Sequence, residues 1–203
     1  RYVHAGAQNI AIARNLAMQK GIETASLVAF IDDDCLPSED WLHELVKIFG
    51  IGGADIVTGV CLDHFPQQCP RWIHRGPYFD RPLTEPDGTI VTNGYIKNIL
   101  IASDAILRAD LKFSPDFGRT GGEDEMFLID ARHAGLKNRR AAHAFVTEQV
   151  PAHRLTFQYQ LRRRFWYGNT ESLISVASGG ATRLRAGLRG GRMMATALTL
   201  VPM

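Results

Sequence analysis

A short apolar run that ends in three consecutive carboxylates constrains this chain more than any other feature. Residues 27–31 (LVAFI) show no polar alternation, which is typical of a buried strand in a parallel sheet. Asp32, Asp33 and Asp34 follow directly, and such a cluster is costly unless a cation satisfies it. Open α/β sheets bind ligands at the carboxyl ends of their strands, so the run predicts an α/β fold with a ligand site at this point.

The chemistry of three neighbouring carboxylates favours a hard divalent cation. Oxygen ligands suit Mg²⁺ or Mn²⁺, which usually keep waters and bridge to substrate phosphates. Side chains alternate along an extended strand, so Asp32 and Asp34 are expected to share one face while Asp33 points away. The alternative is a solvated acidic turn that caps a helix beginning at Ser38.

The rest of the chain alternates predicted helices with predicted strands, as α/β domains do. Strands are expected at residues 27–31, 55–61, 96–102 and 141–148. Helices are expected at residues 8–20 with Gly21 as C-cap, from Ser38, after Ser103, at about 123–133 and after Pro151, where Phe157, Leu161 and Phe165 recur at helical spacing. Residues 62–92 are rich in proline and show no periodicity, which predicts a long functional or mobile loop.

A second acidic motif, Gly121-Gly122-Glu123-Asp124-Glu125, precedes one of these helices. Its glycines permit an unusual backbone and the close approach of a substrate. Carboxylates in a first helical turn lie near the positive end of the dipole, where they stay ionised and act as bases. The alternative is plain N-capping by acidic residues.

Two arginine motifs suggest contacts to anions. Ala13-Arg14-Asn15 places a cation on an otherwise apolar helical stripe, for binding phosphate, for reaching a base, or for an ion pair with an acidic neighbour. The second is the segment 162–168 (RRRFWYG), whose guanidinium groups offer fork-shaped donors for a diphosphate. The alternative for this segment is a solvated helical face.

Composition excludes several classes of protein. The chain has 203 residues, of which 45% are hydrophobic and 22% charged, so it is not disordered, collagen-like or a disulfide scaffold. Residues 1–150 carry a net charge of −5 and residues 151–203 a net charge of +7. The basic end suggests anionic ligands or a lipid surface, or simply a solvated basic helix, and the acidic remainder argues against nucleic acid.

Cysteine and histidine give weak signals for a metal. Three cysteines argue for a reducing compartment or for indifference to redox. A zinc site built from Cys61, His64, Cys69 and His74 matches no common ligand spacing, so loop and core packing is the better reading of these residues. We expect His143 and His153 to be structural rather than ligands.

Taken in order, these motifs resemble the family 2 glycosyltransferases with the GT-A fold, over about residues 2–168. The ARN helix, the strand ending in a DxD motif and the strand with Asn98 are each similar to a family motif. The segment 113–124, ending in Gly-Gly-Glu-Asp, is similar to the family's acceptor-base motif, and the arginine-rich helix follows it. The resemblance implies a mixed, mostly parallel sheet flanked by helices.

The family implies a nucleotide-diphosphate sugar donor, linked to UDP or GDP, and Mn²⁺ or Mg²⁺. The resemblance makes Asp124 the general base, with Glu123 orienting the acceptor or the base, and makes Asp32 and Asp34 the metal-site residues. The residues expected at the donor or its nucleotide are Arg14, Asn15, Asp32, Asp33, Arg163 and Arg164. The residues expected at the acceptor are Asn98, Gly121, Gly122 and Trp166. An inverting, single-displacement transfer follows.

Three departures from the family pattern qualify this reading. The family's domain begins with a strand and a helix that hold the nucleotide base, and this chain starts after them, so half of the nucleotide pocket is expected to be missing. The strand after the base helix lacks the metal-binding histidine of many relatives, which leaves the third ligand open. The processive QxxRW motif is not intact at residues 160–166, which favours a non-processive enzyme.

The expected organisation is a GT-A domain over residues 1–178, incomplete at its N-terminus, and a basic and apolar tail over 179–203 that contacts a membrane. The family implies a cytoplasmic enzyme of polysaccharide or glycoconjugate synthesis at the inner face of a membrane, with a glycan or lipid-linked acceptor. Two alternatives are a non-catalytic module that binds a nucleotide sugar or glycan, and a metal-dependent phosphohydrolase.

Overall fold

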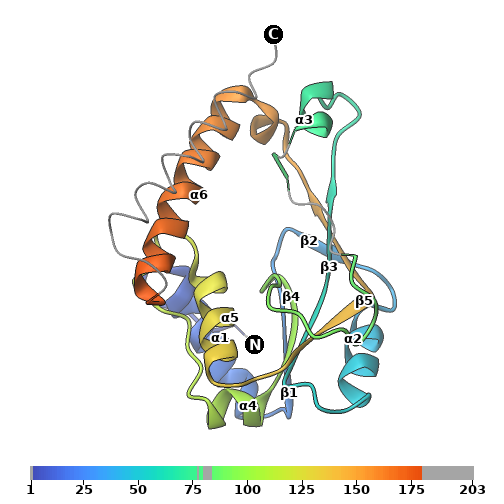
Figure 1. Ribbon diagram of the computed structural model, residues 1–203, viewed down its shortest axis with the longest axis vertical. Helices are drawn as coiled ribbons and strands as arrows, with labels where there is room; N and C mark the ends of the chain where they lie inside the picture. Colours follow the sequence, from blue (N-terminus) through green and yellow to red (C-terminus); the bar gives the residue numbers. More distant parts are fainter. Residues whose placement is uncertain (1, 77, 80–83, 180–203) are drawn as a thin grey trace. The chain divides into compact units, whose positions relative to one another are not determined.

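The computed structural model of the chain describes residues 2–76, 78–79 and 84–179 (Figure 1). The chain divides into two compact units. Unit 1 comprises residues 1–62 and 82–148, and unit 2 comprises residues 63–81 and 149–203. The domain predicted over residues 1–178 therefore includes parts of both units, and the predicted tail from residue 180 onward lies outside the described residues.

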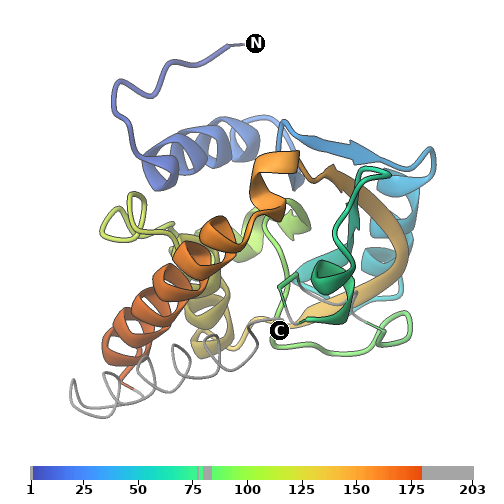
Figure 2. The ribbon, with the colours of Figure 1, turned by 90° about the horizontal axis from the view of Figure 1, so that it is seen from above.

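Unit 1 contains most of a five-stranded sheet with the strand order β1-β4-β3-β5-β2. The strands are β1 (Leu27–Ile31), β2 (Cys35–Pro37), β3 (Ile56–His64), β4 (Asn98–Ala102) and β5 (Asn138–Gln149). The predicted strands are all present, and the three-residue β2 beside β5 is an addition to them (Figure 2).

The sheet is mixed, as predicted, but its pairs are mostly antiparallel rather than mostly parallel. β4 runs antiparallel to both β1 and β3, and β2 runs antiparallel to β5. β3 and β5 run in the same direction, because the Ile56 amide donates to the Lys137 carbonyl at one end and the Val150 amide to the His64 carbonyl at the other. The long apolar runs of β3 and β4 reflect burial on both faces and do not depend on parallel pairing.

Strand β1 is less buried than its sequence predicts. Only Val28 is buried in it, while Ala29 and Ile31 are exposed. Among the described strands, β1 stands at the end of the strand order with β4 as its neighbour. The central β4, in contrast, is buried at every position.

Helices cover both faces of the sheet of unit 1. Helix α2 (Trp41–Gly50) packs on one face through Leu45 and Ile48 against Leu100. On the other face, α1 (Ile10–Ile22), α4 (Ser103–Arg108) and α5 (Glu123–His133) share a core with Ile99 and Ile101 (Figure 1). The alternation of residues 99 to 101 between these two cores follows the two-residue period of a strand.

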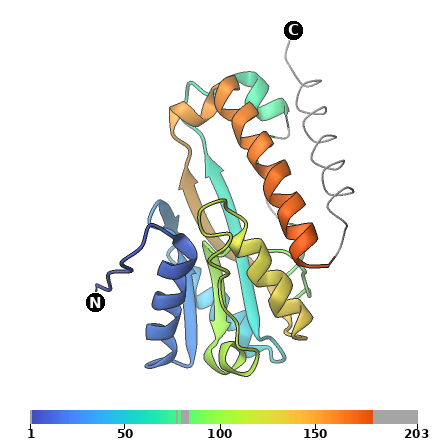
Figure 3. The ribbon, with the colours of Figure 1, turned by 90° about the vertical axis from the view of Figure 1, so that its left-hand side faces the viewer.

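Three predicted helix caps differ from those observed. Helix α1 continues through Gly21 to Ile22, because glycine here permits close packing: a Cβ at Gly21 would lie 2.9 Å from Cγ2 of Val28 in β1. Figure 3 shows α1 alongside β1. Helix α2 begins at Trp41 with Asp40 as N-cap, so Ser38 is not the cap. The buried hydroxyl of Ser38 has no hydrogen-bond partner among the described residues. Ser103 is the first residue of α4 rather than its N-cap, and its hydroxyl donates to the Ala25 carbonyl.

Unit 2 contains α3 (Arg71–Arg75), a short 3-10 helix (Ala152–Leu155) and α6 (Phe157–Ala177). Helix α3 lies within the segment predicted as a loop. The side chains of Ile73, Tyr78, Val150 and Leu155 form the core of this unit. Helix α6 is present as predicted, but its apolar stripe is exposed: Phe157, Leu161 and Phe165 are 38%, 37% and 58% accessible. The buried positions of α6 are Gln160, Gly168, Thr170 and Ile174.

Candidate functional site

Arg14 brings three of the predicted motifs together within unit 1. Its Nη2 lies 3.2 Å from Oδ1 of Asp32, and its Nη1 lies 2.7 Å from Oε1 of Glu123. Helix α1 supplies the guanidinium, the residue after β1 supplies one carboxylate, and the first turn of α5 supplies the other. Of the readings open for Arg14 from the sequence, the structure shows the ion pair with acidic neighbours.

Glu123 is the more buried of the two carboxylates. It is 6% exposed, whereas the side chain of Asp32 is 38% exposed. Burial raises the pKa of Glu123, and the neighbouring charges of Asp124 and Asp32 raise it further, while Arg14 opposes the shift. The guanidinium also lies 5.7 Å from the ring centroid of Phe113, so the pair is held against the core.

The glycines before α5 have the unusual backbone that the sequence predicts. Gly121 has φ +77° and Gly122, the N-cap of α5, has φ +95°, values that other residues rarely adopt. This turn places Glu123 and Asp124 in the first helical turn, where the helix dipole favours negative charge. Asp124 is half-buried, and its Oδ1 accepts a hydrogen bond of 2.8 Å from the Glu125 amide.

Asp32, Asp33 and Asp34 form a tight turn between β1 and β2, which we call the aspartate turn. The Cys35 amide donates to the Asp32 carbonyl at 3.1 Å, which closes the turn. The expectation that Asp32 and Asp34 share one face of an extended strand was therefore wrong, because the backbone reverses direction after Ile31. Asp33 and Asp34 are exposed on this turn.

The donor set at the aspartate turn fits an open cation site rather than a closed one. Among the described residues, no three His, Cys, Asp or Glu side chains gather as a closed metal site requires. Mg²⁺ and Mn²⁺ are commonly held by one or two carboxylates, with waters and substrate phosphates completing the shell. The described partner of His143 is Asp87, at 3.8 Å, and His153 packs against the ring of Tyr159, so neither histidine is shown with the aspartate turn.

Asn98 does not have the predicted place in the acceptor site. It is fully buried; its Nδ2 donates to the carbonyls of Val60 and Ala144, and its Oδ1 accepts from Nε1 of Trp41. With these partners and no exposure, its side chain cannot contact an acceptor. Asn98 instead connects β4 to β3, β5 and α2.

Asn15 likewise has backbone partners. Its amide group donates to the Phe113 carbonyl and accepts from the Phe113 amide, each at 2.8 Å. It thereby ties α1 to the segment that leads to the Gly-Gly-Glu-Asp motif. This use differs from the nucleotide contact expected for it.

The predicted residues of α6 belong to unit 2. Nε of Arg163 donates to the Tyr167 hydroxyl at 2.6 Å, and the guanidinium lies 5.2 Å from the centroid of Phe79. Arg164 is half-buried and Trp166 is 59% exposed. Their donor and acceptor roles stay predictions.

Sequence reasoning missed an ion pair between Lys97 and Glu148. Nζ of Lys97 lies 2.5 Å from Oε2 of Glu148, and the two side chains are 21% and 13% exposed. The signal was present in the sequence, because Lys97 is a lone charge within the apolar segment 96–102 (IKNILIA).

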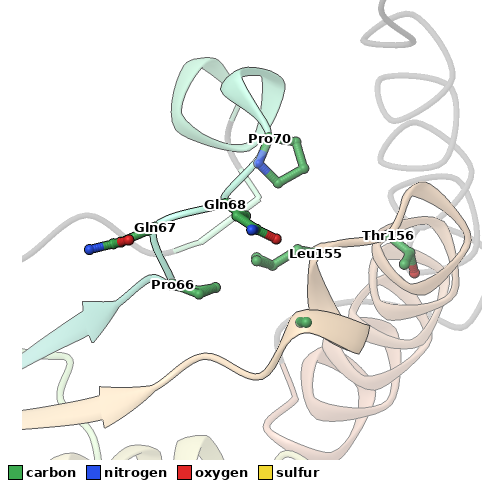
Figure 4. Close-up of a pocket in the computed structure, with 7 residues that line it drawn as sticks. Pro66, Gln67, Gln68, Pro70, Leu155 and Thr156 are labelled. Atoms are coloured by element: carbon green, nitrogen blue, oxygen red, sulfur yellow. The ribbon is translucent and has the colours of Figure 1, made fainter.

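Unit 2 contains a cavity of about 530 Å³ (Figure 4). Its lining residues are Pro66, Gln67, Gln68, Pro70, Ala152, Leu155 and Thr156, which carry no charge. The hydroxyl of Thr156 is already used in capping α6, where it accepts from the Tyr159 amide. None of the predicted site residues lines this cavity.

Known proteins share sequence similarity with the part of the chain that contains these motifs. The family model for glycosyl transferase family 2 matches residues 1–108. The succinoglycan biosynthesis protein ExoM of Rhizobium meliloti is 34% identical over 173 residues, which are 85% of this chain and 55% of that protein. The chain thus spans about half the length of this curated relative.

Solved structures share the fold of the chain. TarS of S. aureus in complex with UDP superposes with a TM-score of 0.52 at 13% identity, covering 98% of this chain and 52% of that one. TarS in complex with UDP-GlcNAc gives a TM-score of 0.53 at 13% identity, over 92% of this chain and 51% of that one. At this identity the likeness shows the fold, and it confirms the predicted GT-A architecture.

The family match covers more than half of the chain. It includes α1 with Arg14, the aspartate turn and the strand with Asn98, which are three of the motifs on which the sequence-based resemblance rested. The chain belongs to glycosyl transferase family 2.

Proposed function

We propose that this chain supplies the donor- and acceptor-handling region of an enzyme that transfers a sugar from a nucleotide-diphosphate sugar to a hydroxyl group of a growing polysaccharide. The observation that carries the proposal is the pairing of Arg14 with both Asp32 and Glu123. It joins the expected donor side and the expected acceptor side in one site. The family match, the succinoglycan relative and the UDP and UDP-GlcNAc complexes of TarS support the reaction class.

The donor side is the aspartate turn. Its exposed carboxylates suit Mn²⁺ or Mg²⁺, with Asp34 as the metal ligand and Asp32 at the ribose or the metal-bound waters. The cation, when bound, would neutralise charge on the diphosphate. Asp33, Arg163 and Arg164 are the further candidates for contacts to a UDP or GDP donor.

The acceptor side is the start of α5, where Asp124 is the general base. The acceptor oxygen forms a bond to the anomeric carbon, the bond from that carbon to the diphosphate breaks, and the acceptor proton passes to Asp124. A single displacement of this kind inverts the anomeric centre. Arg14 holds Glu123 in place, and Glu123 in turn orients the acceptor or the adjacent base.

The whole enzyme acts on a glycan or a lipid-linked glycan and is non-processive, because the QxxRW motif is not intact at residues 160–166. The backbone at Gly121 and Gly122 contributes to the acceptor side, and Trp166 is a separate candidate for acceptor contact. In the described part of the chain, no helix has both the length and the apolar character needed to cross a bilayer. Contact with a lipid surface through residues 179–203 is part of this proposal.

Calorimetric titration of UDP and GDP tests the donor side. Binding is expected to need both Mn²⁺ and the Asp34 carboxylate, so Asp34→Ala should lose it. Asp104→Ala is the matched control, because it removes an exposed carboxylate, 76% accessible, from α4. Binding that survives in Asp34→Ala, or that ignores the metal, would contradict this donor site.

A transfer assay tests the base. Asp124→Asn keeps the carbonyl oxygen that accepts from the Glu125 amide and should lower turnover by about 10²- to 10⁴-fold while leaving UDP binding intact. Glu125→Gln removes a charge from the same helical turn and should retain activity. Full turnover by Asp124→Asn would refute the base. Donor binding without transfer in the unaltered protein would favour the non-catalytic module, and hydrolysis of a phosphoester that needs no nucleotide would favour the phosphohydrolase.

A further inference from the structure

A partly buried lysine, Lys97, stands immediately before β4, the strand that neighbours β1 in the sheet. The register between β1 and β4 ends with Ile31 opposite Asn98. Lys97 immediately precedes Asn98 in the sequence, and Asp32 immediately follows Ile31. On the other side of the turn, Cys35 pairs with Glu148 of β5. The Lys97–Glu148 ion pair therefore joins the residue before β4 to β5, and these two strands pair with β1 and β2, the strands on either side of the aspartate turn.

The charges in this region surround one buried thiol. Cys35 is 7% exposed, and its pKa is raised to about 11, mainly by burial. Lys97 opposes that shift, whereas the carboxylates of Asp34, Glu148 and Asp32 add to it. Lys97 and these three carboxylates thus share one neighbour, the Cys35 thiol, whose residue pairs with Glu148 across β2 and β5.

The ion pair is accessible enough to exchange partners. The Lys97 side chain is 21% exposed and that of Glu148 is 13% exposed, so the pair is partly open to solvent. The ammonium group lies 5.6 Å from the ring centroid of Tyr95, on a flexible stem that carries three donors. A second partner for it therefore does not require the strands to move.

A diphosphate that enters the site needs a cation to offset its negative charge, and the Lys97 ammonium group can supply one. Arg14, the other cation described beside the turn, is already shared by Asp32 and Glu123. A donor adds at least two negative charges to a region rich in carboxylates. A cation held ready by Glu148 can offset that charge at the moment when the leaving group develops it.

We propose that Lys97 is a further donor-site residue, whose ammonium group exchanges Glu148 for an oxygen of the donor diphosphate. The proposal rests on the proposed function and deepens its donor side. As the bond from the anomeric carbon to the diphosphate breaks, its electron pair stays on the diphosphate oxygen. Lys97 stabilises that charge by hydrogen bonding and gives up no proton.

Glu148 provides the test, because a structural and a diphosphate-binding lysine respond to it in opposite ways. If Lys97 only anchors β4 to β5, removing either partner damages the site, and removing both relieves the unpaired charge. If Lys97 binds the diphosphate, Glu148 competes for it. Removing Glu148 alone then favours binding, and removing both does not restore it.

The experiment is calorimetric titration of UDP and of inorganic pyrophosphate, with Mn²⁺ present, into the full chain and four variants. Lys97→Met should weaken UDP binding by roughly 10-fold or more, the size expected for losing a charge-assisted hydrogen bond. Glu148→Gln should bind at least as tightly as the unaltered chain, and the double variant should stay as weak as Lys97→Met. Lys97→Arg should retain most of the affinity.

Controls separate the possible failures. Lys112→Met removes an exposed lysine of unit 1 that pairs with Asp110, and it should leave the affinity unchanged. Thermal unfolding reports whether each variant folds. If Lys97→Met does not fold, the double variant, which leaves no unpaired charge, is measured in its place. Restored binding in the double variant, or unweakened binding in Lys97→Met, would overturn the role of Lys97 alone. Absence of UDP and pyrophosphate binding in the folded, unaltered chain would overturn the proposed donor site as well.

Discussion

At the scale of single residues, the site depends on one guanidinium shared between two carboxylates. The planar fork of arginine can address Asp32 with one nitrogen and Glu123 with another, whereas a lysine offers a single point of charge. Keeping Glu123 charged in this arrangement costs free energy, because burial disfavours its charged form. The site is thus a place where stability and function are expected to conflict.

Replacing Glu123 should reveal that conflict as a pH dependence. Its pKa is raised above the ordinary 4.5, chiefly by burial, so the folded chain binds this proton more tightly than the unfolded chain. The stability that follows is complete below about pH 4.5 and is lost as the pH rises through the raised pKa. Glu123→Gln should therefore become more stable relative to the unaltered protein as the pH rises. At every pH its transfer activity should be lower than that of the unaltered protein.

Thermal unfolding of both proteins between about pH 4 and pH 8 measures this difference. The Tm of Glu123→Gln minus the Tm of the unaltered protein should rise with pH and then level off. A constant difference would show that the ion pair with Arg14 balances the cost of burial, and a difference that falls with pH would show that the ion pair outweighs it.

The sequence was informative about residues whose roles depend on local geometry. Gly121 and Gly122 were predicted from the turn that they permit, and the structure confirms their positive φ angles. The structural partners of Asn98 and Asn15 lie in distant segments, and no local pattern reveals them: Asn98 bonds two backbone carbonyls and the Trp41 indole, and Asn15 bonds the Phe113 backbone. The role of Asn15 at the nucleotide stays a prediction. A buried amide and a ligand-binding amide have the same residue type, and only the tertiary fold separates them.

At the scale of elements, Asn98 is the point where β4 meets β3, β5 and α2. Two backbone carbonyls and one indole depend on its side chain. Each of these groups is costly to leave unpaired in a buried position. The residue therefore stabilises the centre of the sheet instead of recognising an acceptor.

Asn98→Ala should accordingly destabilise the protein by about 3 kcal/mol or more, since it leaves several buried groups unpaired and creates a cavity. Trp41→Phe is the comparison variant, because it removes the indole donor and some ring volume but leaves both carbonyl bonds of Asn98 in place, and it should cost about 1–2 kcal/mol. Urea unfolding measures both. Unchanged stability in Asn98→Ala, together with weaker acceptor binding, would restore the original assignment of this residue.

Helices and strands were predicted correctly where the sequence pattern extends over many residues. They were missed where pairing with a distant strand determines the structure. Strands β3 and β4 and helices α5 and α6 follow from their sequence patterns. Strand β2 was missed because three residues carry no period, and its pairing with β5 exists only in the assembled sheet. The strand directions could not be predicted either, because a buried run looks alike in parallel and antiparallel pairs.

At the scale of the whole molecule, charge is divided along the chain. The first 150 residues have a net charge of −5, and the remaining 53 have +7. Such a division attracts the basic end to anionic surfaces and keeps the acidic part away from them.

Sedimentation with anionic lipid vesicles tests the expected membrane contact. Binding should fall as salt rises, since exposed charges are screened within about 10 Å at 0.1 M ionic strength. Replacing Arg183, Arg185, Arg189 and Arg192 with Gln should weaken binding by about 1 kcal/mol per arginine. Equal binding to neutral vesicles, or by the substituted chain, would contradict an electrostatic contact.

The hydrogen bond from the Trp41 indole to Asn98 makes Trp41 an intrinsic fluorescence probe of the sheet centre. The chain has three tryptophans; Trp41 belongs to unit 1, while Trp72 and Trp166 belong to unit 2. The emission of an indole that donates to a buried amide differs from that of an indole in water. Fluorescence of a chain that retains only Trp41 would therefore follow the melting of the sheet centre without a signal from unit 2.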